Sequence, residues 1–189
     1  MRPKEGPRRW FSMLEGKKVN LRLLEKEDLS TVADWVNDIR VTGAYAPMWQ
    51  STKPMIEKDW LEATADKRWF AVETKKGAKI GLIGHFDSGG LQEIGFAIAP
   101  GERGKGCCSE AAKLLVDFLF LSKNVQRIQA KCDVENNASK RVLENVGFKQ
   151  EGVLRKAAFL GGTWRNLSIY SIVRDEWKKP AVLKVPGRV

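Results

Sequence analysis

The spacing of apolar and polar residues predicts an opening strand and two helices. Residues 18–23 (KVNLRL) alternate between apolar and polar side chains, which is the period of a half-buried strand. From Leu29 to about Arg40 the apolar residues recur at i, i+3, i+4 and i+7, so a helix is predicted there. A loop over 41–52 follows. A second helix is predicted from Pro54 to Ala65, because proline is tolerated in a first helical turn.

The middle of the chain predicts three strands followed by a helix. The segments 68–74, 78–86 and 91–99 are short apolar runs separated by the turn sequences KKG and DSGG. Turns this short join antiparallel neighbours, so an antiparallel meander is predicted. Apolar residues at helical spacing from Ala111 to Leu119 then predict a helix.

The last third of the chain predicts a strand, a helix and two further strands. The strand covers 125–132, the helix covers 136–148 and ends at Gly147, and the last strands cover about 148–160 and 164–173. The order β-α-α-β-β-β-α-β-α-β-β is neither a regular βαβ series nor strands alone. We therefore predict an α+β fold in which about seven strands form a mixed sheet with four helices.

Composition indicates one domain with basic ends. The 189 residues are 43% hydrophobic, which suffices for one sizeable core. The net charge of +10 is concentrated at the ends, because 1–9 and 174–189 each carry +3. We predict a domain over 12–177 between a basic N-terminal tail (1–11) and a basic C-terminal tail (178–189). Such tails are solvated, or they contact ribosomal RNA or an acidic protein.

Several classes of protein are disfavoured by the sequence. No apolar stretch is long enough to span a bilayer, and the sequence RRWF lacks the apolar segment of a twin-arginine signal, so a cytoplasmic protein is expected. Three cysteines, an odd number, argue against a disulfide framework. Because His85 is the single histidine, no metal site is expected.

The sequence GERGKGCCSEA, at 101–111, lies where a predicted strand turns into a predicted helix. The first amides of a helix lack intrahelical partners and the helix dipole adds partial positive charge, so anions are favoured there. Gly104 and Gly106 allow positive φ and close approach of a ligand, while Arg103 and Lys105 supply cations. The turn therefore predicts a phosphate site.

Two common nucleotide motifs do not fit this turn. A P-loop requires Lys-Ser/Thr at its closing glycine, but Gly106 is followed by Cys107 and Cys108. The dinucleotide motif requires a third glycine where Ser109 stands. Two interpretations remain. The turn binds a phosphate ligand of another kind, or it is a flexible turn that binds no ligand.

The segment RGKGCC, at 103–108, resembles the signature Arg/Gln-x-x-Gly-x-Gly/Ala of the GNAT superfamily of acyl-CoA-dependent N-acetyltransferases. Arg103 and Gly106 match this signature. Cys108 departs from it, because the family prefers glycine or alanine at that position. A small side chain still permits close approach of a pyrophosphate, with some crowding.

The resemblance extends well beyond this turn. The segments 93–111, 135–155 and 164–177 are similar to successive blocks of the branch typified by RimJ and RimL. That branch acetylates the N-terminal α-amine of ribosomal proteins. Together with the first strand and helix, the resemblance covers about Leu14 to Trp177.

This resemblance implies the GNAT fold, with a mixed, mostly antiparallel, twisted sheet that opens between two central strands. Acetyl-CoA would lie in the V between the strand containing 93–98 and the strand ending at Cys132. Its pantetheine amides would pair with the backbone near 96–99, as an added strand does. The cofactor residues expected on this basis are Phe96, Ala97, Ile98, Arg103, Gly104, Lys105, Gly106, Cys107, Cys108, Ser109, Asn136 and Ser139.

Acyl transfer needs a neutral amine, so a base is expected on the strand at the edge of the V. Glu93 is the first candidate, because alternation places it on the face opposite Ile94, Phe96 and Ile98. An ordinary solvated glutamate and an anchor for the substrate ammonium are the alternative roles. Glu151 is the second candidate. A modest base acting through water suffices for an α-amine.

The departing thiolate needs a proton donor. The resemblance implies that Asn136 fixes the pantetheine arm and that Ser139 faces the sulfur, where its hydroxyl can donate. Leu143 stands where many GNAT enzymes have a tyrosine in this helix. Water and Tyr170 are the alternative donors.

The cysteines are expected to have structural roles. Cys107 and Cys108 lie at a helix N-terminus, where a thiol pKa falls. They lack a base partner and occupy the phosphate turn, so they are interpreted as filler rather than nucleophiles. Cys132 is expected to be a small buried side chain.

The acceptor wall is predicted from aromatic residues in loops and in the last strand. Tyr45 and Trp49 lie in the loop 41–52, and the sequence FLGGTW, at 159–164, precedes the last strand. Tyr170 is the third aromatic candidate for contact with the acceptor. Aromatic residues at these places also cap cores.

Three functions compete. The first is transfer of an acetyl group from acetyl-CoA to a protein N-terminal α-amine, by direct attack on the thioester and without a metal. The second is the same transfer to a small amine, such as an amino sugar, a polyamine or an antibiotic; Asn166 stands where the branch usually has aspartate. The third is a non-catalytic nucleic-acid-binding module that uses the basic tails with Trp10 and Phe11. A homodimer is left open.

Overall fold

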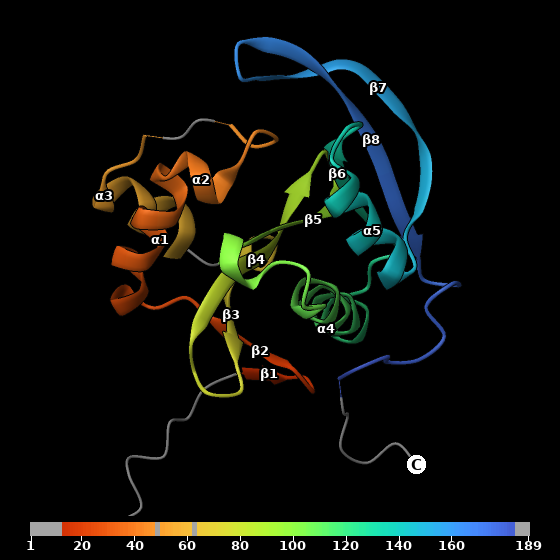
Figure 1. Cartoon of the computed structure of the whole chain (residues 1–189). Coiled ribbons are helices and arrows are strands. Elements are labelled where there is room, and N and C mark those ends of the chain that lie inside the picture. The colour runs from red at the N-terminus through yellow and green to blue at the C-terminus, as the bar shows by residue number, and fades with distance from the viewer. Residues whose placement is uncertain (1–12, 48–49, 62–63, 184–189) are drawn as a thin grey trace, which may run out of the picture.

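One sheet organises the part of the chain that the computed structural model describes, residues 13–47, 50–61 and 64–183. The strands are β1 (Met13–Glu15), β2 (Val19–Leu23), β3 (Arg68–Thr74), β4 (Lys79–Ser88), β5 (Leu91–Ile98), β6 (Arg127–Asp133), β7 (Lys149–Leu160) and β8 (Thr163–Val173). They lie in the order β1-β2-β3-β4-β5-β6-β8-β7 (Figure 1). All neighbours pair antiparallel except β5 and β6, which are parallel.

Helices cover both faces of this sheet (Figure 1). They are α1 (Leu29–Asn37), α2 (Ile39–Thr42), α3 (Lys53–Ile56), α4 (Cys107–Ser122) and α5 (Asn137–Val146). Helices α4 and α5 pack on one face, and α1 and α3 pack on the other through a separate apolar cluster. The predicted α+β fold with a mixed, mostly antiparallel sheet is confirmed. The sheet has one strand more than predicted, because β1 is too short to show an alternating pattern.

The first predicted helix is broken into two. Asp38 is extended, with ψ of 109°, and its carboxylate accepts a hydrogen bond from the Arg40 amide at 2.9 Å. An aspartate that bonds to nearby backbone competes with the helical pattern and starts a new turn instead. The helix predicted to reach Arg40 therefore ends at Asn37, and α2 occupies the start of the predicted loop.

The second predicted helix is shorter and less regular than the pattern indicated. After α3 the chain continues as a π-helical turn over Glu57–Leu61. The predicted end at Ala65 is wrong, because the Thr64 hydroxyl accepts from the Lys67 amide at 3.0 Å in a non-helical turn.

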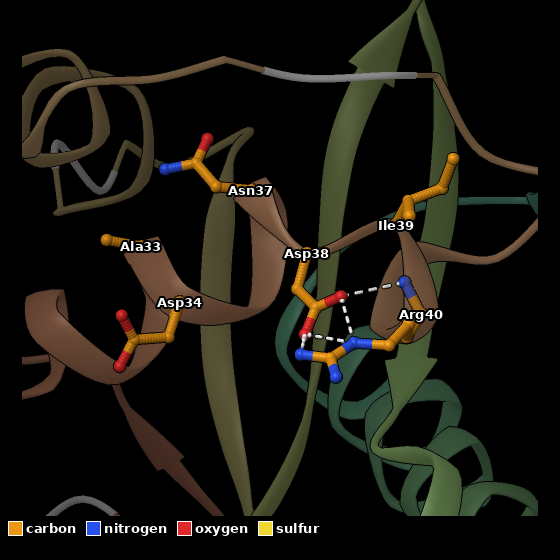
Figure 2. Close-up of a pocket in the computed structure, with 6 residues that line it drawn as sticks. All are labelled: Ala33, Asp34, Asn37, Asp38, Ile39 and Arg40. Atoms are coloured by element: carbon orange, nitrogen blue, oxygen red, sulfur yellow. Dashed lines mark hydrogen bonds and ion pairs between the residues drawn. The ribbon is translucent and has the colours of Figure 1, made fainter.

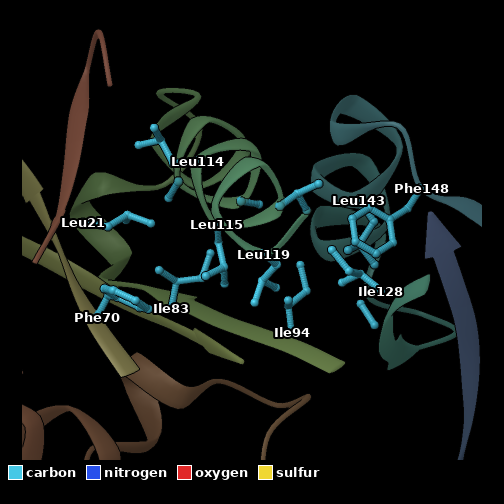
Figure 3. Close-up of a cluster of buried hydrophobic side chains, with 14 of the residues drawn as sticks. Leu21, Phe70, Ile83, Ile94, Leu114, Leu115, Leu119, Ile128, Leu143 and Phe148 are labelled. Carbon is cyan, nitrogen blue, oxygen red and sulfur yellow. The ribbon is translucent and has the colours of Figure 1, made fainter. Parts of the chain in front are cut away.

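The larger core lies between α4 and the centre of the sheet. Figure 3 shows Leu115 and Leu119 of α4 above Ile83 and Ile94 of β4 and β5. This is the stripe that the helical spacing of α4 predicts. Because α4 is anchored along its length, its first turn is held at a fixed place beside the end of β5.

The C-terminal segment stays on the domain beyond Trp177, where a tail was predicted to begin. Asp117 of α4 is 1% exposed and accepts from the Trp177 indole at 2.8 Å. Three successive backbone amides, those of 181–183, also donate to this carboxylate at 2.9–3.1 Å. A buried carboxylate requires such donors, so the segment packs on α4. The predicted tail 1–11 and residues 184–189 lie outside the described residues.

A buried histidine makes the stability depend on pH. His85 is 0% exposed, its Nδ1 lies 2.8 Å from the Gln92 amide oxygen, and its Nε2 has no hydrogen-bond partner among the described residues. Burial lowers the pKa of His85 to about 4, and the charge of Lys123 adds to this effect. In the unfolded chain the pKa is near 6.5, so unfolding takes up a proton between these two pH values.

We expect this histidine to remove stability as the pH falls from 6.5 towards 4. Its contribution to the free energy of unfolding is complete above pH 6.5 and falls by about 2.5 kcal/mol on going from pH 7 to pH 4.5. Urea unfolding of the wild type and of His85→Gln at both pH values measures this difference. An equal pH dependence in both proteins would contradict the assignment.

Candidate active site

The sheet loses its pairing between β5 and β6. The two strands pair only through Gln92 with Ile128 and Glu93 with Gln129. Strand β5 then continues to Ile98 while β6 runs on without pairing to it. The predicted opening between these two strands is therefore confirmed.

The open edge of β5 presents backbone groups that can pair with a ligand. The Ala99 amide donates to the Ile80 carbonyl of the β4 side at 2.9 Å. Because successive residues of a strand direct their amide groups to opposite edges, those of Ile98 and Phe96 face the open edge. The Ile98 carbonyl is taken by the Arg103 guanidinium at 2.8 Å. The Ile98 amide and both backbone groups of Phe96 are the remaining groups on this edge.

The glycine-rich turn has the backbone conformation that the sequence predicts. Gly104 has φ of +76° and Gly106 has φ of +78°, a region in which side chains are strained. Gly106 is the N-cap of α4, and no side chain caps this helix. No described residue accepts a hydrogen bond from the amides of 107–109. The first turn of α4 therefore offers free amides to an anion.

The predicted cations of the turn are bound to protein groups. The Arg103 guanidinium also donates to the Val41 carbonyl, at 2.6 Å, so it ties the turn to α2. The Lys105 ammonium is paired with Glu102 at 2.9 Å. Arg103 and Lys105 therefore shape the turn through these contacts. A different lysine, Lys18, lies against the turn, with its ammonium 3.2 Å from the Lys105 carbonyl oxygen.

Two of the cysteine thiols, those of Cys108 and Cys132, are poor nucleophiles. Burial raises the pKa of Cys108 to about 12 and that of Cys132 to about 11. The expected lowering of the pKa at a helix N-terminus is therefore outweighed by burial at Cys108. The structural interpretation of these residues agrees with this environment.

The start of α5 brings Asn136 and Ser139 beside the end of β6. Asn136 is the N-cap, and its side-chain oxygen accepts from the Ser139 amide at 3.0 Å. An asparagine in this position is a common helix start, so sequence alone indicates the geometry. Leu143, one turn further on, is buried in the core.

Glu93 lies at the point where β5 and β6 part. It is 8% exposed, and its Oε2 accepts from Gln129 at 3.0 Å and from Lys131 at 2.8 Å. It is therefore not an ordinary solvated glutamate. No described residue donates to Oε1, so this oxygen is left for water or an amine.

Glu151, the second candidate base, is bound in an ion pair elsewhere. Hydrogen bonds from Arg127, and then from Ser171, lower its pKa to about 2. Strand β7, which carries it, is the outer edge of the sheet and is separated from β5 by β6 and β8. Its position and weak basicity disfavour Glu151 as the base.

The predicted acceptor residues lie in different surroundings. Tyr45 packs against Arg165 of β8, with the guanidinium carbon 5.9 Å from the ring centre. Trp49 lies outside the described residues. Tyr170 is 1% exposed and its hydroxyl bonds to Glu144 and Gln150, which disfavours contact with an acceptor. Its side chain projects towards α5, into the core.

Arg165 gathers two carboxylates at the end of β6. It donates to Asp133 at 2.7 Å and forms an ion pair with Glu135. Burial acts to raise the pKa of Asp133, but hydrogen bonds from Arg165 hold it below its usual value. Arg165 and Lys131 were not predicted from the sequence. The partner of a charged side chain in a strand can be identified only when the neighbouring strands have been aligned in the sheet.

The last hairpin is exposed at its turn. Phe159 and Trp164 pack edge to face with ring centres 5.6 Å apart, and both side chains are more than half exposed. The Asn166 side chain accepts from the Lys156 amide at 2.8 Å, where β7 has a positive φ. Asn166 therefore stabilises an irregular strand through its side-chain oxygen, an acceptor that an aspartate would also supply.

A shallow hollow of about 570 Å³ lies outside this region, between α1 and α2 (Figure 2). At its edge Asp38 and Arg40 bond to each other, as Figure 2 shows. None of the expected cofactor or catalytic residues lines it. The lining residues are Ala33, Asp34, Asn37, Asp38, Ile39 and Arg40.

The described residues contain neither a cluster of metal-ligating side chains nor a membrane-spanning helix. Within them, no three histidine, cysteine or acidic side chains are grouped so that they could hold a metal ion. None of the helices in those ranges is both long and apolar enough to cross a membrane.

Comparison with known proteins supports the family suggested by the motif. The acetyltransferase (GNAT) domain family matches residues 18–149. An uncharacterized N-acetyltransferase of Bacillus subtilis is 36% identical over 85 residues, which are 45% of this chain and 50% of that protein. The solved structure of Mycobacterium smegmatis RimJ in complex with CoA-disulfide has a TM-score of 0.79 at 22% identity, covering 90% of this chain and 91% of that one.

Two relatives that align over most of their length differ in the activity for which they are named. A Bacillus subtilis protein named for an inferred ribosomal N-acetyltransferase activity is 27% identical over 179 residues, covering 89% of this chain and 98% of the relative. The spermidine N(1)-acetyltransferase of Escherichia coli is 29% identical over 180 residues, covering 90% and 92%. The family match itself spans more than half of the sequence, so this chain belongs to the GNAT family of N-acetyltransferases.

Proposed function

We propose that this N-acetyltransferase transfers the acetyl group of acetyl-CoA to the N-terminal α-amine of a protein. The observation that carries the choice of acceptor is the pairing of the acidic groups around the split between β5 and β6. Glu93 is paired with Lys131, and Asp133 and Glu135 are paired with Arg165. A polyamine carries several positive charges and is recognised by unpaired carboxylates. An α-amine carries one charge and does not require several unpaired carboxylates.

Relatives support both of the leading candidates for the acceptor. The relative named for ribosomal acetylation favours a protein N-terminus, whereas the spermidine acetyltransferase favours a small amine. The paired carboxylates support the protein N-terminus over a polyamine. Membership of an enzyme family gives no support to a non-catalytic nucleic-acid-binding module.

The residues around the split fit coenzyme A. Free amides in the first turn of α4, with the open backbone of Gly104 and Gly106, suit a diphosphate. The open edge of β5 at Phe96 and Ile98 suits the pantetheine amides. The bound cosubstrate supplies an activated acetyl thioester, and the chain's own groups orient it, accept the amine proton and donate to the leaving sulfur.

Glu93 is the base of this proposal. An N-terminal α-amine with a pKa of about 7.7 to 8.0 is roughly 10% neutral at pH 7, so a modest base is sufficient. Oε2 of Glu93 is fixed by Gln129 and Lys131, and Oε1 is left to accept the amine proton directly or through water.

Ser139 is the proposed donor to the leaving thiolate. Its backbone is held by Asn136 at the start of α5, next to the end of β6. Tyr170 is removed from consideration because its hydroxyl is bound to Glu144 and Gln150. Water remains the alternative donor.

The acceptor is tested by competition between amines. Peptides with free N-termini, the same peptides acetylated at the N-terminus, spermidine and an aminoglycoside are incubated with acetyl-CoA and the protein, and products are identified by mass spectrometry. We expect acetylation at the peptide α-amine, with kcat/KM at least about 10-fold above that for spermidine. A higher kcat/KM for spermidine, with no α-acetylated peptide, would show that the acceptor is wrong.

A further inference from the structure

A lysine remote in sequence lies on the glycine-rich turn. The Lys18 ammonium donates to the Lys105 carbonyl at 3.2 Å, across a separation of 87 residues. A Cβ atom added at Gly106 would lie 3.2 Å from the same ammonium. The positive charge therefore lies directly beside the N-cap of α4, where the free amides begin.

The backbone of Lys18 is fixed to α4. Glu110, in the first turns of α4, accepts from the Lys18 amide at 2.6 Å and from the Val19 amide at 3.2 Å. A Cβ atom added at Gly16 would overlap the same Glu110 oxygen and would lie 2.8 Å from the backbone carbonyl oxygen of Val19, so the turn between β1 and β2 favours glycine there. These contacts hold the β1–β2 turn against the helix start, and the Lys18 side chain extends from this fixed point.

The charge of Lys18 has no carboxylate partner among the described residues. Lys105 of the same turn is paired with Glu102, and Arg103 binds two carbonyl groups. Its ammonium makes one hydrogen bond, to the Lys105 carbonyl, and has hydrogens left for a ligand. A diphosphate seated on the amides of α4 carries negative charge into reach of this ammonium.

We propose that Lys18 binds the diphosphate of coenzyme A and acts together with the amides of the α4 first turn. This inference rests on the proposed function, because it places the same cosubstrate in the same turn. It adds a cofactor-binding residue from the β1–β2 turn, outside the glycine-rich motif. A compact, hydrated ammonium suits this role as a point charge at the rim of the site.

The test compares Lys18→Gln with Lys17→Gln, which removes an equal charge from the neighbouring position. Binding of acetyl-CoA is measured by calorimetry at low and at high salt. We expect Kd to rise about 5- to 20-fold in Lys18→Gln at low salt and less at high salt. Lys17→Gln should stay within about twofold of wild type, and Lys18→Arg should restore most of the affinity.

Ligand truncation decides which phosphate is bound. CoA lacking its 3′-phosphate keeps the diphosphate, so Lys18→Gln should lose the same factor of affinity for this ligand as for CoA. A loss seen only with intact CoA would place Lys18 on the 3′-phosphate and overturn the inference, as would equal losses in the Lys17 and Lys18 variants. Thermal unfolding of the unliganded variants reports on folding.

The two proposals fail in different ways. Unchanged Kd in Lys18→Gln, with normal binding by the wild type, contradicts this inference alone. Normal acetyl-CoA binding without acetylation of any peptide contradicts the proposed acceptor alone. A folded wild type that binds neither form of CoA contradicts both.

Discussion

Gly106→Val is expected to lower kcat/KM for acetyl-CoA by about 100-fold or more. Gly106 has φ of +78°, where a branched side chain strains the backbone of the N-cap. The new side chain would also displace the Lys18 ammonium, which lies 3.2 Å from the position of the added Cβ atom. Both effects act on the amides that are proposed to bind the diphosphate. Steady-state kinetics with acetyl-CoA as the varied substrate measure the loss.

Two other glycines make the control series for this prediction. Gly104 has positive φ but nothing within 4 Å of an added Cβ atom, so Gly104→Ala should lose about 5- to 10-fold through strain alone. Gly101 has open space and no positive φ, so Gly101→Ala should stay within about twofold of wild type. Equal activity in all three variants would contradict a role for the turn in binding the cosubstrate.

Glu93→Gln is expected to lower kcat about 100-fold at pH 6.5 while leaving the Kd of acetyl-CoA unchanged. The substitution keeps the shape and one acceptor oxygen but removes the charge and the base. At low pH most of the acceptor amine is protonated, so the loss is largest there. Above about pH 8 the α-amine is itself largely neutral, so the deficit should narrow. The measurement is a pH profile of kcat with a peptide acceptor.

Lys131 supplies the control for a structural effect of Glu93. Removing the Glu93 charge leaves Lys131 without its partner, which lowers stability. In the double variant Glu93→Gln/Lys131→Met we expect stability to recover while kcat stays low. Glu151→Gln should keep wild-type kcat, because that carboxylate lies on the outer strand. Recovery of kcat in the double variant would show that Glu93 serves only to neutralise the charge of Lys131 and is not the base.

The sequence predicts those parts of the fold in which the spacing of apolar residues repeats over a short stretch of chain. The meander of β3, β4 and β5 and the stripe of α4 follow from spacing that repeats over several residues. The glycine-rich turn is also predictable, because positive φ at Gly104 and Gly106 leaves a direct mark in the amino-acid type. Short or interrupted elements leave little signal, so β1 and the break at Asp38 were missed.

The remaining part of the site depends on contacts between distant segments. Lys18 and Lys131 are ordinary lysines in the sequence, and their roles follow only from the Lys105 carbonyl and the Glu93 carboxylate that they meet. The burial of Tyr170 in the core was not predicted either. Alternation fixes which face of β8 carries it, but the sequence alone does not say which face borders the core.

The C-terminal boundary of the domain also depends on contacts between distant segments, which the sequence does not reveal. The basic residues after Trp177 favoured a solvated tail, yet Asp117 is buried and draws the amides of 181–183 onto α4. Nothing in the helical pattern of α4 marks this aspartate as an acceptor for the chain end. Composition reports on the average character of a segment, whereas a single buried carboxylate decides where it lies.

A crystal structure of the protein with coenzyme A tests the central claim most directly. The account predicts the diphosphate within hydrogen-bonding distance of the amides of 106–109, the Lys18 ammonium beside it, and the pantetheine arm along the open edge of β5 at Phe96 and Ile98. Electron density for the diphosphate at another place, with those amides bonded to protein groups, would contradict it.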